Sequence, residues 1–181
     1  MILRQYFDPR SIGTIALWLD AADATSTGAW LDKSGNARNA AQLATNNQPV
    51  LTASAMGNKP ALYFDGINDS LALPVIPLSA WTAFAAVSPI TAGTAIHVTA
   101  GNTSVLTLSS GSSAAVVTAT GSVTTVSAFY GSDTRIGAKW DSGALKDFYK
   151  GYIGEIVVYS SALSDAQVNA VSRYLARKWG L

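Results

Sequence analysis

The chain has 181 residues, no cysteine, 12 basic and 11 acidic side chains, and a charged fraction of only 13%. A chain of this length is expected to form one domain and to bury roughly 70% of the surface that its unfolded form exposes, so it needs no disulfide or metal to support a core. The net charge of +1 argues against a dedicated nucleic-acid-binding protein, and the lack of cysteine excludes a disulfide framework, a thiol nucleophile and a cysteine-based zinc site.

The N-terminus reads MILRQYFDPR and lacks the apolar run of a signal peptide. The sequence also contains no apolar run of about eighteen residues that could cross a membrane. We therefore expect neither a classically secreted nor a membrane-inserted protein. Residues 1–10 are predicted to form an arm that docks on a partner or adds a first edge strand, and residues 11–181 are predicted to form a single domain.

Segments with the alternation and β-branched composition of strands follow along the chain. In the first half they are residues 12–19, 61–64 and 80–87. The second of these is predicted to end at a turn, because Asp65 and Gly66 favour turn conformations.

The stretch from Ser70 to Ser132 contains 63 residues without a single Asp, Glu, Lys or Arg. Its Ser, Thr, Ala and Val residues predict an antiparallel meander with turns at Gly and Asn. The predicted strands are 94–99, 104–109, 115–120 and 122–127. Because charged residues normally protect sheet edges from pairing with other chains, this stretch must be covered, either by its own sheets or by other subunits.

The C-terminus is predicted to form a helix over about 164–178. Ser164 and Gln167 have the spacing of a capping box, and Leu163 and Val168 that of a hydrophobic staple. The apolar face consists of Val168, Val171 and Leu175, and the helix is predicted to end at Gly180. Three basic residues near that end are interpreted as partners of the helix dipole on a solvated face: Arg173, Arg177 and Lys178.

Five motifs then allow a family resemblance to be stated. They are DPRS at 8–11, LWLDAAD at 17–23, WLDKSGN at 30–36, KPALYFDGIND at 59–69, and GYIGEIVVY at 151–159 followed by ALS at 162–164. In this order they resemble the laminin-G-like, concanavalin A-like lectin/glucanase superfamily, and in particular its stand-alone domains in bacteriophage virion proteins and bacterial surface proteins. The resemblance implies an all-β jelly-roll sandwich of two antiparallel sheets, with one C-terminal α-helix, in agreement with the predicted strands.

An enzymatic activity is not expected. Glycoside hydrolysis usually requires two carboxyl groups, but Glu155 is the only glutamate and the Glu-x-Asp-x-x-Glu motif of the superfamily's glucanases is absent. Alternation places Glu155 opposite Ile156 and Val158, and the resemblance suggests a structural position on the last strand. His97 is the only histidine, and there is no Gly-x-Ser-x-Gly motif, so neither a serine triad nor a histidine zinc site is expected.

Calcium is the one cofactor that the resemblance implies, since relatives hold Ca²⁺ with Asp and Asn side chains and backbone carbonyls. The candidate ligands are Asp32, Asn36, Asp65, Asn68 and Asp69. The same residues are typical of turns in which Asp and Asn accept hydrogen bonds from their own backbone, and this interpretation requires no ion. Both alternatives remain open.

A sugar-binding site is the hypothesis that a lectin-like fold suggests, because aromatic rings stack on pyranose faces while Asn and Asp bind hydroxyl groups. The tryptophans at Trp18, Trp30 and Trp179 are predicted to lie in the core. The candidate sugar-binding residues, in or beside polar loops, are Trp140, Tyr130, Tyr149, Asn102 and Asp141. The alternative is that these rings only cover the edge of the sandwich.

We therefore expect a non-catalytic, phage-type virion surface protein that binds cell-surface carbohydrate. The alternative is a purely structural capsid decoration, head-fibre or tail-associated subunit without sugar binding. The expected partners are further copies of the chain, in a homo-oligomer such as a trimer, other virion proteins and a cell-surface glycan. The expected location is the virion, or alternatively the bacterial cell surface.

Overall fold

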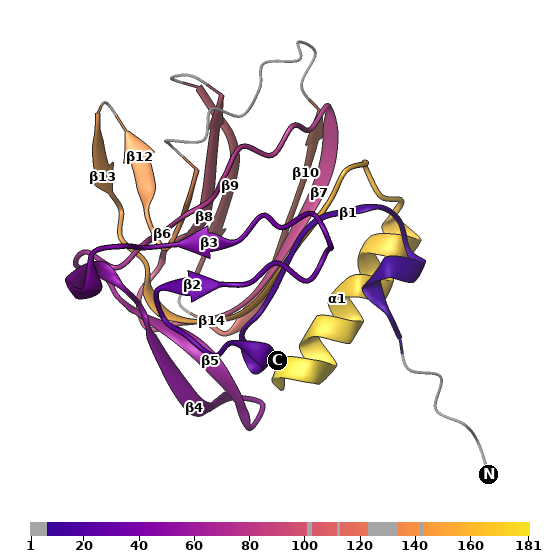
Figure 1. Cartoon of the computed structure of the whole chain (residues 1–181). Coiled ribbons are helices and arrows are strands. Elements are labelled where there is room, and N and C mark those ends of the chain that lie inside the picture. The colour runs from indigo at the N-terminus through magenta and orange to yellow at the C-terminus, as the bar shows by residue number, and fades with distance from the viewer. Residues whose placement is uncertain (1–6, 101–102, 112, 123–133, 142) are drawn as a thin grey trace.

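The computed structural model describes residues 7–100, 103–111, 113–122, 134–141 and 143–181. Within these residues two six-stranded sheets pack face to face, and one α-helix, α1 (Asp165–Trp179), lies against the outer face of the first sheet (Figure 1). Every strand pair is antiparallel. The predicted all-β sandwich with a C-terminal helix is confirmed.

Sheet A contains the longest strands. Its order is β10 (Ala115–Ser122), β7 (Ala80–Pro89), β14 (Lys150–Tyr159), β5 (Lys59–Asp65) and β4 (Val50–Met56), and β1 (Ile15–Asp20) also pairs with β14. The first half of β14 pairs with β5 and the second half with β1, so β14 is a central strand along its whole length.

Sheet B is built mainly from short strands. Its order is β2 (Ala29–Trp30), β3 (Ala40–Ala41), β6 (Leu71–Ala72), β11 (Arg135–Ile136), β8 (Gly93–Ala100) and β9 (Thr103–Ser110). A separate hairpin follows β11 and is formed by β12 (Lys139–Asp141) and β13 (Ala144–Lys146). Three 3-10 turns complete the described elements: η1 (Pro9–Ser11), η2 (Ala21–Asp23) and η3 (Thr45–Asn47).

The core lies between the two sheets and consists of side chains that alternate inward along each strand. Its members are fully buried and include Leu62, Phe64, Val87 and Ile153 from sheet A and Trp30, Leu71, Ile96 and Ile136 from sheet B. Because each sheet contributes a continuous apolar face, the sandwich needs no further support.

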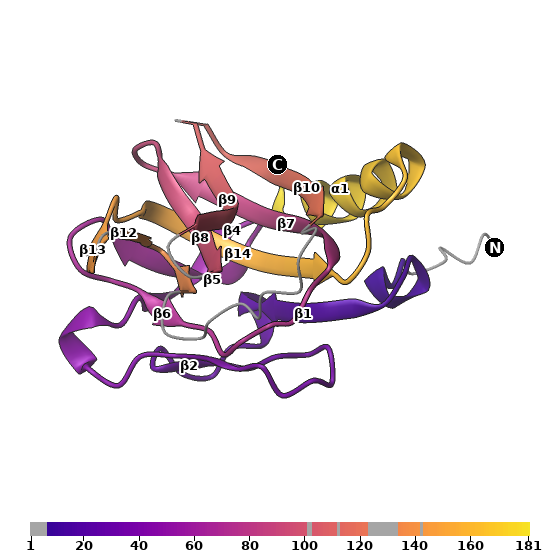
Figure 2. The ribbon, with the colours of Figure 1, turned by 90° about the horizontal axis from the view of Figure 1, so that it is seen from above.

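A second apolar layer lies under α1, on the opposite side of sheet A from sheet B (Figure 2). Val171, Leu175 and Trp179 are buried there, and Gly180 ends the helix with a φ of 69°. At the other end, Gln167 Oε1 accepts a hydrogen bond from the Ser164 backbone N–H (2.9 Å), which confirms the predicted capping box. Trp18, Trp30 and Trp179 are all buried, as predicted.

The predicted meander in the uncharged stretch is wrong. β8 pairs with β9 in sheet B, whereas β7 and β10 pair with each other in sheet A. The chain therefore crosses from one sheet to the other after β7 and returns before β10. Strands without charged residues can present either face to the core, so alternation alone did not fix which sheet they join. Most of the predicted strand 122–127 lies outside the described residues.

The prediction for residues 1–10, an arm or a first edge strand, lies mostly outside the described residues, which begin at residue 7. The described part leads into η1, where the Asp8 carboxylate accepts a hydrogen bond from the Arg10 backbone N–H (2.9 Å). The first strand therefore begins at Ile15 rather than at Ile12. Within the described part of the chain, no helix has the length and apolar character needed to cross a membrane.

Candidate functional site

The β12–β13 hairpin presents the one sequence-predicted sugar-binding ring that is accessible in the described part of the chain. Trp140 lies at its centre, opposite Leu145, and is partly exposed. The guanidinium carbon of Arg135 lies 5.9 Å from the centroid of the Trp140 ring. Asp141 follows on the same strand and forms an ion pair with Lys146 (3.5 Å). Arg135 on β11 and the hairpin therefore bring a cation and an aromatic ring together. Asp141 is the next residue along the strand, so its side chain points to the opposite face of the hairpin, toward Lys146.

The hairpin lies beside the outer face of sheet B, where His97 contacts the Trp140 backbone. Successive strand pairs place Ala29, Ala41, Ala72, Arg135 and His97 opposite one another in a single row across β2, β3, β6, β11 and β8. Directly opposed residues of antiparallel strands point to the same face. The three alanines thus form a flat surface of small side chains beside Arg135.

His97 anchors the hairpin to this face. Its side chain is fully buried and makes a hydrogen bond with the backbone of Trp140. Burial lowers the pKa of His97, so the neutral imidazole is favoured in the folded chain. The sequence indicated only that this histidine was not catalytic; its contact with Trp140 depends on how the hairpin folds back over β8.

The prediction that Tyr149 binds sugar is wrong. The residue is fully buried, its ring meets that of Phe64 edge-on at 6.2 Å, and its hydroxyl donates a hydrogen bond to the Tyr152 carbonyl (3.1 Å). Polar neighbours in the sequence do not place the Tyr149 side chain at the surface, because the chain just before β14 turns it into the core. Asn102 and Tyr130 lie outside the described residues. Of the five candidates, Trp140 and Asp141 lie on β12, where their side chains point to opposite faces of the hairpin.

The first two predicted calcium ligands lie in the loop between β2 and β3. The Asp32 carboxylate accepts hydrogen bonds from the backbone N–H groups of Trp18 (3.0 Å), Ser34 (2.9 Å) and Arg38 (3.0 Å). These bonds hold the pKa of Asp32 below its ordinary value although burial acts to raise it. The Asn36 amide donates to the carbonyls of Ile15 and Ala16, both at 3.1 Å.

The other three lie in the turn after β5. Asp65 Oδ1 accepts hydrogen bonds from the backbone N–H groups of Ile67 (2.8 Å), Asn68 (3.2 Å) and Asp69 (3.4 Å), and Asp69 Oδ2 accepts one from the Asp65 N–H (2.9 Å). In both loops an Asp carboxylate thus accepts hydrogen bonds from backbone N–H groups of its own loop, as expected if these residues form turns. Among the described residues no three His, Asp or Glu side chains form a group that could hold a metal ion, and calcium binding stays a prediction.

A buried polar network under α1 was not found from the sequence. The Glu155 carboxylate is fully buried and accepts hydrogen bonds from the indole N–H groups of Trp18 (2.7 Å) and Trp179 (2.8 Å) and from the Tyr174 hydroxyl (3.1 Å). Lys178 completes it, 2.7 Å from Glu155 Oε2 and 2.6 Å from Asp20 Oδ2.

The sequence predicted that Lys178 lies on a solvated face, and this prediction is wrong. The Lys178 side chain is only 13% exposed. The opposite pKa directions of the two carboxyl groups follow from their surroundings. Burial and the nearby Asp20 charge raise the pKa of Glu155. Burial also acts to raise the pKa of Asp20, but hydrogen bonds from Lys178 and Lys33 outweigh it and lower that pKa.

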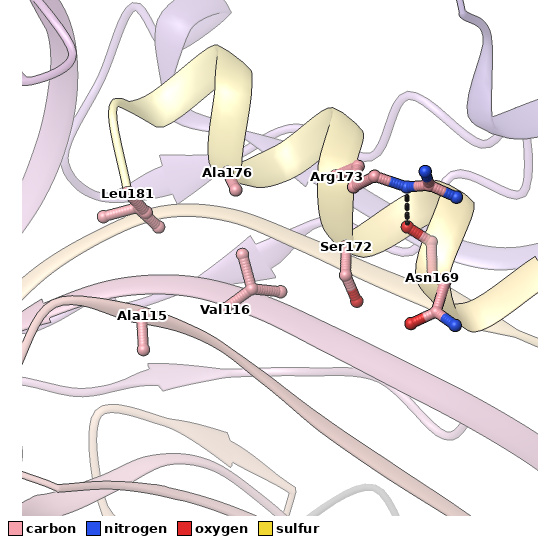
Figure 3. A pocket seen from close by; sticks show the side chains of 7 residues that line it. All are labelled: Ala115, Val116, Asn169, Ser172, Arg173, Ala176 and Leu181. Carbon is pink, nitrogen blue, oxygen red and sulfur yellow. Dashed lines mark hydrogen bonds between the residues drawn. The ribbon is translucent and has the colours of Figure 1, made fainter. Parts of the chain in front are cut away.

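A groove elsewhere on the molecule has a different chemistry. It has a volume of about 530 Å³ and lies between α1 and β10 (Figure 3). It is lined by Ala115, Val116, Asn169, Ser172, Arg173, Ala176 and Leu181. Among the described residues that line it there is no aromatic ring, and Arg173 has the only charged side chain; this arginine donates a hydrogen bond to the Asn169 carbonyl (3.2 Å). It offers no stacking surface for a sugar.

Comparison with known proteins identifies the fold. No protein-family model and no curated protein sequence matches the chain. Among solved structures, domain 4 of AbnA, a GH43 extracellular arabinanase from Geobacillus stearothermophilus in complex with arabinotriose, superposes with a TM-score of 0.53 and 14% identity. The match covers 88% of this chain and 98% of that domain.

A sialidase from Trypanosoma rangeli in complex with sialic acid superposes with a TM-score of 0.54, also at 14% identity. A mutant of that sialidase displaying trans-sialidase activity gives a TM-score of 0.56 at 14% identity. In each case the match covers 91% of this chain but only 33% of the sialidase, so the chain spans about a third of that protein's length. At these identities the similarity establishes the sandwich fold alone.

Proposed function

We propose that this chain is a non-catalytic carbohydrate-binding module, and that the sugar binds on the outer face of sheet B at Trp140 and Arg135. The observation that carries the proposal is the partly exposed Trp140 ring, held by β-pairing and by the His97 contact beside an open row of alanines. A preorganised ring costs little entropy when it binds a ligand.

The chemistry of these two side chains suits a saccharide. The apolar face of a sugar ring can stack on the indole, while the guanidinium donates hydrogen bonds to its hydroxyl groups. The fold supports the proposal because the similar arabinanase domain was solved with arabinotriose and the similar sialidase with sialic acid.

The proposal assigns no glycoside hydrolysis to Glu155 and Asp20. That reaction needs one carboxyl group that can protonate the leaving oxygen and a second that acts as nucleophile or base. Glu155 is fully buried and its two oxygens already accept four hydrogen bonds or ion pairs. Asp20, its nearest acidic partner in the network, is held by Lys33 and Lys178.

The first experiment is a screen of arabinotriose, sialyllactose and bacterial envelope polysaccharides against the purified chain, run both in calcium and in chelator. We expect saturable binding, and Trp140→Ala should weaken it roughly tenfold or more because the stacking surface is lost. Leu43→Ala is the matched control, since Leu43 is 95% exposed in the loop before η3. If the folded wild-type chain binds none of these sugars, the carbohydrate proposal is wrong.

The chelator arm of the screen tests the calcium prediction. Binding that disappears in chelator and returns with added Ca²⁺ would make the Asp32 and Asp65 loops ligand candidates again. Equal binding in both buffers would show that sugar binding does not depend on calcium, and the Asp32 and Asp65 loops would then be interpreted as turns.

The proposal also includes a role in a phage-type virion, as a homo-oligomer. It is supported by the five sequence motifs and by the sheet edges: β9 and β10 end the described order of the two sheets, and both come from the stretch without charged residues. Uncharged edge strands readily pair with other chains. The structural alternative is a decoration, fibre or tail subunit without sugar binding. Such a subunit would assemble through the same two edge strands, β9 and β10.

Substituting Val105→Lys on β9 tests the assembly. We expect the solution mass, measured by analytical ultracentrifugation, to fall from that of an oligomer to that of one chain. A wild-type protein that is already monomeric, or a folded variant of unchanged mass, would contradict the oligomer.

A further inference from the structure

A second surface rich in aromatic residues lies on the opposite side of the molecule, on the outer face of sheet A. Strand register places Val50, Tyr63, Tyr152 and Ser88 opposite one another across β4, β5, β14 and β7. The next row contains Asp65 opposite Lys150. We call these six residues the tyrosine strip.

The strip is the part of this face that α1 leaves uncovered. The helix ends at Trp179, whose ring lies over Gly154, two residues beyond Tyr152 on β14. Val50 is 56% exposed, and the side chains of Tyr63, Tyr152 and Ser88 are partly exposed. The same face that binds the helix at one end is therefore open to solvent at the other.

The two tyrosines form a paired aromatic surface with unused hydrogen-bonding groups. Their ring centroids are 5.2 Å apart and the planes are tilted by 49°. Across the described part of the chain, neither phenol hydroxyl makes a hydrogen bond, although each can both donate and accept. The Tyr152 main chain, by contrast, is engaged, since its carbonyl accepts the Tyr149 hydroxyl.

The size and charge of the strip indicate the kind of ligand. Four strands about 4.8 Å apart and rows about 6.6 Å apart give a surface of roughly 200 Å², far below the ~800 Å² per partner of a stable protein interface. Asp65 and Lys150 are directly opposed and their charges cancel. A small, uncharged ligand with many hydroxyl groups meets these conditions, whereas a second protein, a polyanion or a membrane does not.

From these observations we infer that the tyrosine strip is a second carbohydrate-binding site, for two or three residues of a neutral sugar chain lying across the strands. This inference rests on the proposed function, because it assumes that the chain binds sugars at all. With one site on each outer face, a single chain can hold two glycans on opposite sides, which raises avidity for a polymer without any new contact.

The test is calorimetric titration of the purified chain with arabinotriose and, separately, xylotriose. We expect two sugars bound per chain for the wild type, one for Trp140→Ala, one for Tyr152→Ala, and none for the double variant at the same concentrations. Tyr63→Phe and Tyr152→Phe keep the rings and remove the hydroxyls; they should weaken the second site a few-fold while preserving its stoichiometry. Ile67→Ala, 72% exposed in the neighbouring turn, is the matched control.

The outcomes separate the two proposals. If the wild type binds one sugar per chain, and Tyr152→Ala binds it with unchanged affinity while Trp140→Ala does not, the second site is refuted and the proposed function stands. If the wild type binds neither trisaccharide, both proposals fail for neutral sugars. Circular dichroism of each variant confirms that lost binding is not lost folding.

Discussion

At the scale of single residues, Lys178 links two acidic side chains of sheet A. One ammonium group contacts two buried carboxylates, Asp20 and Glu155, that come from strands far apart in sequence. Burying a carboxylate without a counter-charge costs folding free energy. The Lys178 ammonium offsets this cost for both acids.

Substituting Lys178→Met should therefore destabilise the chain by about 3–5 kcal/mol, the usual cost of removing one partner of a buried ion pair. The measurement is urea unfolding followed by tryptophan fluorescence. Arg177→Met is the control, because Arg177 lies one residue earlier and is exposed; it should change stability by well under 1 kcal/mol. Equal midpoints for the two variants would show that the network is not stabilising.

His97 gives a prediction about pH. Its pKa is lowered by burial in the folded chain, so the unfolded chain binds the proton more strongly. The stability is fully present above the unfolded pKa of about 6.5 and is lost as the pH falls below it toward the folded pKa. We expect the midpoint of urea unfolding to decrease between pH 7 and pH 5, and this decrease to be smaller in His97→Gln. A variant with the same pH slope as the wild type would rule out His97 as the cause.

At the scale of elements, the irregularity in β14 determines how the helix docks. The register with β7 shifts between Ile153 and Glu155, which is a β-bulge. A bulge places two successive residues on nearly the same side of a strand. Gly154 and Glu155 both meet Trp179 as a result: the glycine leaves room for the indole ring, and the glutamate accepts its N–H.

Substituting Gly154→Ala should disturb this docking. An added Cβ would lie 2.6 Å from two atoms of the Trp179 ring, so the helix end must shift. We expect a loss of about 1–3 kcal/mol, typical of overpacking, and a change in tryptophan emission. Gly111→Ala is the matched control, since a Cβ there meets nothing within 4 Å. Identical stability of the two variants would mean that α1 is not tightly packed on β14.

At the scale of the whole molecule, three layers are joined by contacts that cross the sequence. The helix packs on sheet A, Gln167 donates to the Ile12 carbonyl (3.1 Å), and the Tyr159 hydroxyl donates to the Pro9 carbonyl (2.9 Å). The first and last described segments thus hold each other in place, and we expect no independent unit within the chain.

Unfolding should accordingly be a single transition. Far-UV circular dichroism, which reports on α1 and the strands, and near-UV circular dichroism, which reports on the packed aromatic rings, should give the same midpoint in urea. Separate midpoints, with helical signal lost first, would contradict this and would identify α1 as a detachable layer.

The sequence by itself determined the features that depend on neighbouring residues. Alternation predicted the long strands β5, β7, β8 and β10 almost to their ends, and the capping box fixed the start of α1. The aspartates at Asp32 and Asp65 have the hydrogen bonds that turn chemistry predicts, because these bonds join groups only a few residues apart.

Only the tertiary structure decided the features that join distant segments. The sheet to which each uncharged strand belongs, the burial of Tyr149, and the Asp20–Lys178–Glu155 contacts all depend on which strands become neighbours. The tyrosine strip is a further case, since Tyr63 and Tyr152 are 89 positions apart in sequence and meet only through the register of β5 and β14. Local preferences act over a few residues, whereas register and burial are settled by the free energy of packing the whole sandwich.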